Sequence, residues 1–204
     1  MPTLKLGSTT AMTESGGVLT YLNVPAGHII KIYSKVFKAR QAFTNTGAGT
    51  DSNYITVGTG ASGADGDPLQ ITTDTPASSS SKYLITCTLH QSRSQDGMLG
   101  FRLMYNNAGT HTAITLGNVG GASQSRVTFG RGHPSTLGNS GNYGLAQTGI
   151  VYLWEPASAA AQTIFVKGCN YNTSANHINV DDSNSDTQHV VRAISTLTVQ
   201  EIAG

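Results

Sequence analysis

Residues 82–90, with the sequence KYLITCTLH, alternate more regularly than any other part of this chain and constrain its fold most strongly. Every second position is apolar, at Ile85, Cys87 and Leu89, whereas the positions between them are mixed in polarity. Because successive side chains of a β-strand point to opposite faces, this pattern predicts a strand with one face on a core. Such a half-buried strand is typical of an antiparallel sandwich.

Strand-like segments of this kind recur along the chain, separated by Gly, Asn and Asp residues. Together with residues 82–90 they are residues 29–37, 53–57, 100–105, 111–116, 127–129, 148–154, 162–171 and 190–202. Regularly spaced short strands with turn residues between them indicate a sandwich or barrel. No segment repeats apolar residues at the three- and four-residue spacing of a long helix. Residues 156–161 are compatible with one helical turn or with a hairpin loop.

The chain carries few charges, and this limits its partners. Only 11% of its 204 residues are charged, whereas about 25% is usual. With a formal net charge of +1 it has no broad field to attract nucleic acid. No stretch approaches the ~20 apolar residues of a membrane span, so we expect no membrane insertion. Residues 1–20 lack the pattern of a secretory signal, which predicts folding in the cytoplasm.

The first part of the chain is predicted to form an arm. Residues 4–6 and 18–22 resemble two strands, and the paired glycines within residues 14–17 favour a hairpin turn. Two strands alone are marginal in water, so the arm needs a surface to pack against. We therefore divide the chain into an N-terminal arm or tether, residues 1–26, and a β-sandwich body, residues 27–204.

Two distant segments have features that belong together. Residues 71–89, ITTDTPASSSSKYLITCTL, combine a Thr-Pro turn, a Ser-rich stretch and a strand that begins with Lys. Residues 195–204, STLTVQEIAG, form a strand ending in Glu-Ile near the end of the chain. In these features residues 27–204 resemble the C-terminal jelly-roll module of tailed-bacteriophage virion proteins, which include capsid decoration (cement) proteins and tail-fibre tips.

The resemblance implies an all-β jelly-roll β-sandwich that assembles as a homotrimer in a virion, built in the host cytoplasm. The first hypothesis is a capsid cement or decoration protein that bridges subunits of the major capsid protein, because the chain has no long shaft. The alternative is a tail-fibre or receptor-binding tip that docks on a tail or fibre protein and recognises a host surface glycan. A secreted lectin or an enzyme accessory module is a third class.

Motifs for catalysis are incomplete. Residues 138–142, GNSGN, begin like a nucleophile elbow, but Asn142 replaces the last Gly and the flanking strand and helix are missing. Glu155 and Glu201 are expected at edge or interface positions that form ion pairs, because carboxylates are mostly exposed. The sequence therefore predicts no catalytic residue, no enzyme activity and no cofactor.

Metal and thiol chemistry is weakly supported. Asp182, Asn184 and Asp186, within residues 181–186, have the spacing that begins a calcium loop, but Thr187 replaces the expected Gly. A solvated loop is the expectation and a calcium site the alternative. The two cysteines, Cys87 and Cys169, are expected to be buried free thiols.

Carbohydrate binding is the strongest ligand hypothesis, because sugars are held by aromatic rings and by amides that hydrogen-bond to hydroxyls. Residues of both kinds lie in expected loops, where binding often resides: Tyr143, Asn139, Asn142, Tyr171 and Asn172. These five residues are the candidate contacts for a glycan or a partner. The alternative is that the two tyrosines only cover the ends of the sandwich.

Overall fold

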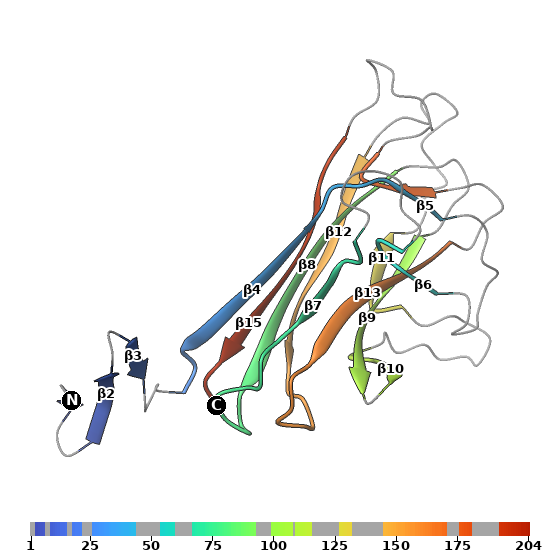
Figure 1. Ribbon diagram of the computed structural model, residues 1–204. Helices are drawn as coiled ribbons and strands as arrows, with labels where there is room; N and C mark the ends of the chain where they lie inside the picture. The colour runs from blue at the N-terminus through green and yellow to red at the C-terminus, as the bar shows by residue number, and fades with distance from the viewer. Residues whose placement is uncertain are drawn as a thin grey trace.

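The described residues form strands and no helix (Figure 1). The computed structural model describes residues 3–6, 9–15, 18–21, 26–43, 54–59, 67–92, 99–107, 109–115, 127–131, 145–170, 176–180 and 192–204. The strands are β1 (Thr3–Leu6), β2 (Thr9–Ser15), β3 (Val18–Tyr21), β4 (Ile29–Phe37), β5 (Gln41–Phe43), β6 (Ile55–Thr56), β7 (Gln70–Thr72), β8 (Lys82–Ser92), β9 (Leu99–Asn107), β10 (Thr110–Ala113), β11 (Phe129–Arg131), β12 (Leu145–Trp154), β13 (Thr163–Asn170), β14 (Asn176–Ile178) and β15 (Ser195–Ile202).

Two antiparallel sheets make up the body. In the first, β4 pairs with β15, β15 with β8, and β8 with β12, while the short β14 and β5 extend it at one end. In the second, β6 and β7 pair with β13, β13 with β9, and β9 with β10 and β11. We call these the first and the second sheet.

The chain crosses between the sheets in the jelly-roll order. From β4 in the first sheet it passes to β6 and β7 in the second, back to β8, and on to β9, β10 and β11. It then returns to β12, crosses to β13 and ends in β15, which lies between β4 and β8. This wrapping of two antiparallel sheets is the jelly roll, so the predicted fold class is confirmed.

The core lies between the inner faces of the two sheets. Along β8 the side chains of Tyr83, Ile85, Cys87 and Leu89 are buried and the intervening ones are partly exposed, which confirms the predicted alternation. From the second sheet, the ring of Phe101 meets Phe43 edge-on, with centroids 6.5 Å apart. A Cβ on Gly168 would lie 2.8 Å from that Phe43 ring, so the aromatic contact depends on a glycine there.

Residues 71–89 and 195–204, which lie far apart in the sequence, are neighbours in space. Strands β8 and β15 pair side by side, with Glu201 opposite Tyr83. Glu201 is fully buried, and its Oε1 accepts hydrogen bonds from the Ala77 amide, at 2.6 Å, and the Ser81 hydroxyl, at 2.9 Å. The Ser-rich stretch is thereby fastened to the last strand.

The expected edge position of Glu201 was wrong, because its register gives it the inward parity of Leu197 and Val199 on a central strand. The same expectation for Glu155 is confirmed. Its carboxylate pairs with the Lys82 ammonium at 2.5 Å at the ends of β12 and β8, where both side chains are exposed.

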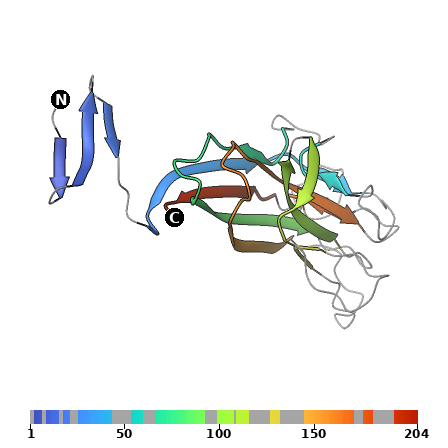
Figure 2. The same ribbon diagram turned by 90° about the horizontal axis from the view of Figure 1, so that it is seen from below.

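The N-terminal arm is a three-stranded sheet and not the predicted hairpin. Ser15 pairs with Val18, as the predicted turn requires, but the partner of β3 is β2, and β1 adds a third strand. Sequence reasoning missed β2, whose residues TTAMTES do not alternate in polarity. Figures 1 and 2 show this small sheet next to the sandwich, and none of its strands pairs with a sandwich strand among the described residues.

Other differences are local. The short strands β5, β7 and β14 were not predicted. Of the strand expected over residues 53–57, residues 54–57 are described, and only Ile55–Thr56 forms a strand. Residues 156–161 form neither a helical turn nor a hairpin loop, because they connect β12 in the first sheet to β13 in the second.

Candidate assembly surface

The outer face of the first sheet is the candidate functional surface, and cross-strand pairing defines it. Outward residues of β4, β15, β8 and β12 lie side by side in three rows. The rows are Val36–Thr196–Thr88–Gly149, Ser34–Thr198–Thr86–Val151 and Ile32–Gln200–Leu84–Leu153. We call these twelve residues the assembly face.

The assembly face is apolar and hydroxyl-rich and carries no charged side chain. Val151 is 65% exposed and Ile32 61%, and Leu153 and Val36 are also exposed. The charged pair of Lys82 and Glu155 lies beyond the third row, at the rim. Isolated exposed apolar residues are ordinary, but here four of them share one uncharged face, with Thr and Gln residues of β15 and β8 between the two edge strands.

Local sequence explains why strands form here although their outward residues are uncharged. Thr, Ile and Val are β-branched and favour strands whether they face a core or solvent. The hydroxyls of Ser34 and Thr198 lie 3.5 Å apart across β4 and β15, which is within reach of a hydrogen bond. The strands therefore form without the Lys and Glu residues that usually make a solvent-facing sheet polar.

The two edge strands of the first sheet differ in charge. On β4, Lys31 and Lys35 have the parity opposite to the assembly face and bind Asp74, at 3.3 Å, and Asp67, at 3.5 Å. The hydrogen bond to Asp74 raises the pKa of Lys31 above its usual value. Charged residues that point inward discourage an edge from pairing with another chain.

Strand β12 has no such protection. Its ten residues contain no charged side chain and no proline, and within the described residues its outer edge pairs with no strand. Long uncharged edges of this kind are ready to pair with another chain. The assembly face thus continues to an open edge on the β12 side.

The structure does not test the residues predicted for glycan contact. Tyr143, Asn139, Asn142, Tyr171 and Asn172 all lie outside the described residues, as does the acidic segment 181–186. Among the described residues, no group of three or more His, Cys, Asp or Glu side chains could hold a metal ion. The described residues also contain no helix that is long and apolar enough to cross a membrane.

Both cysteines are buried free thiols, as predicted. Burial raises the pKa of Cys87 far above the usual range of a thiol, so its thiolate is scarce near neutral pH. Sequence reasoning assigned no function to the twelve face residues. The signal that could have found them was the scarcity of Lys and Glu, but composition alone does not show which positions face outward.

Comparison with known proteins leaves the family open. No protein-family model matches the chain, and no curated protein matches it. Among solved structures, one titled as the structure of infectious bursal disease virus, Gx strain, aligns with all of this chain at 10% identity and a TM-score of 0.35. The chain spans 47% of the length of that viral chain.

Proposed function

We propose that this chain is a structural protein of a virus particle, which assembles as a homotrimer through its assembly face and acts as a capsid cement or decoration protein. The observation that carries the proposal is the uncharged outer face of the first sheet, with Ile32, Val36, Val151 and Leu153 exposed on it. A surface of this kind suits a protein whose task is contact with other subunits.

Self-association is favoured by the chemistry of the face. Burying apolar surface contributes roughly 25 cal/mol per Å² removed from water. The face has no charged group to desolvate, so the main cost of burying polar interfaces is absent. Its threonine hydroxyls can exchange hydrogen bonds with those of a second copy. A face lying along a threefold axis touches both neighbours at once, and the open β12 edge adjoins it.

The virion assignment is supported by the segments that resemble the phage module. Residues 71–89 and 195–204 contain most of β8 and all of β15, the two central strands of the assembly face. Three copies sitting on a shell would add interface area between capsid subunits. The separate sheet β1–β2–β3 would then serve as the tether to the major capsid protein.

A receptor-binding tip is the second candidate, because it requires a ligand site and the second sheet carries a pocket. Adding the purified protein to capsids and to host cells separates the two roles. Attachment to capsids supports the cement role, and attachment to cells without capsid binding supports the tip.

The first experiment is the absolute mass by light scattering coupled to gel filtration. With a 21.3 kDa chain, we expect a single species of about three times that mass. Val151→Lys should give a folded monomer, because it places a charge within the uncharged rows of the assembly face. Ala159→Lys, at an exposed loop position, is the matched control and should remain a trimer. A wild-type monomer, or a trimer unaffected by Val151→Lys, would overturn the proposal.

A further inference from the structure

Three exposed apolar residues mark the end of the first sheet from which the N-terminal arm leaves. Ile29, at the start of β4, is 51% exposed, and Ile32 and Leu153 lie level with each other in the third row of the assembly face. Figure 2 shows the arm beyond this end of the sandwich. Exposed apolar groups at the origin of a separate sheet indicate a contact that is made there in the assembled protein.

The origin of the arm is fixed to the sandwich by backbone hydrogen bonds. The Gly27 amide donates to the Ala203 carbonyl at 2.8 Å, and the Ala203 amide donates to the His28 carbonyl at 2.8 Å. Residues 22–26 lie between β3 and this anchor and reach at most about 18 Å when extended. That distance exceeds three strand spacings in a sheet, roughly 14 Å. The arm can therefore reach a neighbouring chain, but only one that lies close to the start of β4.

Two strand edges of the chain are unpaired among the described residues and are suited to each other. β3, at one side of the arm, pairs only with β2, and β12, at one side of the first sheet, pairs only with β8. Neither strand contains a charged residue. An uncharged edge offers its amide and carbonyl groups to another strand, whereas the inward-pointing Lys31 and Lys35 protect the β4 edge from such pairing.

A trimer built through the assembly face brings these two edges together. β4 and β12 are opposite edges of the first sheet, so three such sheets around an axis place the β4 side of one copy beside the β12 edge of the next. The arm leaves from the start of β4, at the end of the sheet where Leu153 lies on β12. A contact between two different edges repeats around a threefold axis and closes after three copies.

We propose that in the trimer the outer edge of β3 pairs with the β12 edge of the neighbouring copy, so that each copy donates its arm to the next. The inference rests on the proposed trimer and names the partner of its open edge, a strand of a second copy. This pairing extends the first sheet across the subunit boundary. β1, on the other side of the arm, keeps its outer edge for the proposed contact with the capsid.

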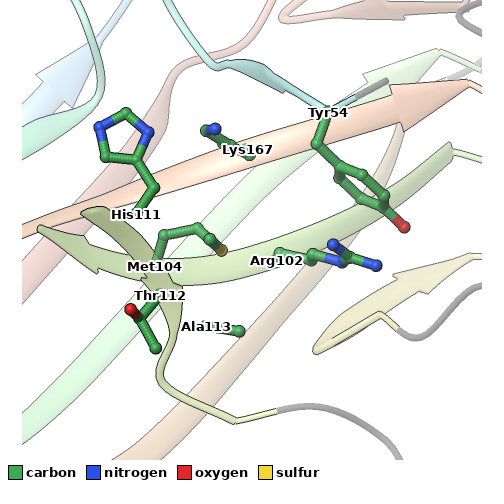
Figure 3. Close-up of a pocket in the computed structure, with 7 residues that line it drawn as sticks. All are labelled: Tyr54, Arg102, Met104, His111, Thr112, Ala113 and Lys167. Atoms are coloured by element: carbon green, nitrogen blue, oxygen red, sulfur yellow. The ribbon is translucent and has the colours of Figure 1, made fainter. Parts of the chain in front are cut away.

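The second sheet takes no part in the proposed contact. Its outer side carries a pocket of about 350 Å³, in which Lys167 on β13 lies opposite Arg102 on β9 (Figure 3). The guanidinium carbon of Arg102 lies 3.9 Å from the centroid of the Tyr54 ring, and Figure 3 shows His111 on the other side of the pocket. Because this pocket and the assembly face belong to opposite sheets, the exchanged arm leaves the pocket accessible.

The test is chemical cross-linking of the full-length protein that carries Thr20→Cys on β3 and Leu153→Cys on β12. Both native cysteines are buried, so a short bis-maleimide should react only with the introduced pair. We expect denaturing gels to show two and three linked chains, because each bridge joins a copy to its neighbour. Thr20→Cys combined with Thr110→Cys, at an exposed residue of β10 in the second sheet, is the matched control and should not link three chains.

Light scattering on the same samples separates failure of this inference from failure of the proposed function. A trimer whose gel contains only single chains would overturn the arm exchange and leave the trimer standing. Links within one chain would overturn it as well, because they place the arm on its own sandwich. A monomer, both here and in the wild type, would overturn the trimer and the arm exchange together.

Hydrogen exchange provides a second measurement that needs no cysteine. Thr20→Pro removes an amide hydrogen from β3 and disfavours its pairing, but leaves the assembly face unchanged. We expect this variant to remain a trimer and the amides of β12 to exchange at least about tenfold faster than in the wild type, because those on the open edge lose their partners. The amides of β8, which lies inside the sheet, should not change. Equal exchange of β12 in the two trimers would refute its pairing with β3.

Discussion

The outer faces of the two sheets differ in how far their side chains are exposed, although on both faces these side chains point away from the core. On the first sheet Ile32 and Val151 point outward and are more than half exposed. On the second sheet Arg102, Met104 and Phe165 also point outward, yet all three are buried. The first face is open and uncharged, and the second is covered and contains a charged pocket.

This difference shows that the direction of a side chain and its exposure are separate properties, and a period-two pattern reports only the first. Alternation tells which side chains leave the core, because parity is a local property of a strand. It does not tell what they meet outside. Around β9 and β13 the outward side chains contact Tyr54 and β10, whereas those of β8 and β15 meet no further layer among the described residues. An open face is available for other subunits, and a covered one can build a pocket.

The largest expected effect compares one outward residue from each face. Phe165→Ala should cost about 3–5 kcal/mol of unfolding free energy, because it leaves a cavity beside His111. Val151→Ala, measured on protein too dilute to associate, should change it by no more than about 0.5 kcal/mol. Denaturant titrations provide both values. Similar losses at the two positions would abolish the distinction between a covered and an open face.

A second pair of variants compares an inward-facing residue with an outward-facing neighbour on the same strand. Leu89 is fully buried on β8, so Leu89→Ala should cost about 2–5 kcal/mol. Its neighbour Thr88 lies on the assembly face, and Thr88→Ala is the control, with little effect on the dilute protein. A loss below about 1 kcal/mol for Leu89→Ala would mean that the two faces of β8 are assigned the wrong way round.

A smaller effect is expected where the last strand of the first sheet holds the Ser-rich stretch. Glu201→Ala removes the acceptor of two hydrogen bonds, from Ala77 and Ser81, and should cost about 1–3 kcal/mol. Glu201→Gln keeps an acceptor oxygen at that position and should lose less. If both variants unfold at the wild-type denaturant concentration, the buried carboxyl does not fasten this turn.

The smallest expected effect concerns the two cysteines, because we expect neither of them to react with a thiol reagent in the native protein. Cys87 points inward from the first sheet and Cys169 outward from the second, yet both are buried. A thiol reagent should therefore label neither in the native protein at pH 7–8 and both after unfolding, since reaction requires an accessible thiolate. Rapid native labelling of Cys169 alone would show that the outer face of the second sheet is open after all.

Much of the fold was predictable because its signals are local. The alternation of residues 82–90 predicted β8, and Asn106 and Gly109 are residue types that favour the turn before β10. Gly109 has a φ of +91° and donates its amide hydrogen to Asn106 Oδ1 at 2.9 Å. Asn and Gly favour such turns wherever they occur in a chain. The jelly roll itself was predicted from the resemblance of two segments and not from these local patterns.

The sequence by itself therefore determined where most of the long strands lie, which residues favour turns between them, and which side of β8 is apolar. Only the tertiary structure decided that Glu201 is buried, that Lys167 lies opposite Arg102, and that one outer face is covered while the other is open. The reason is physical. Turn preference and side-chain parity depend on neighbouring residues, whereas register and burial depend on which distant strands pair.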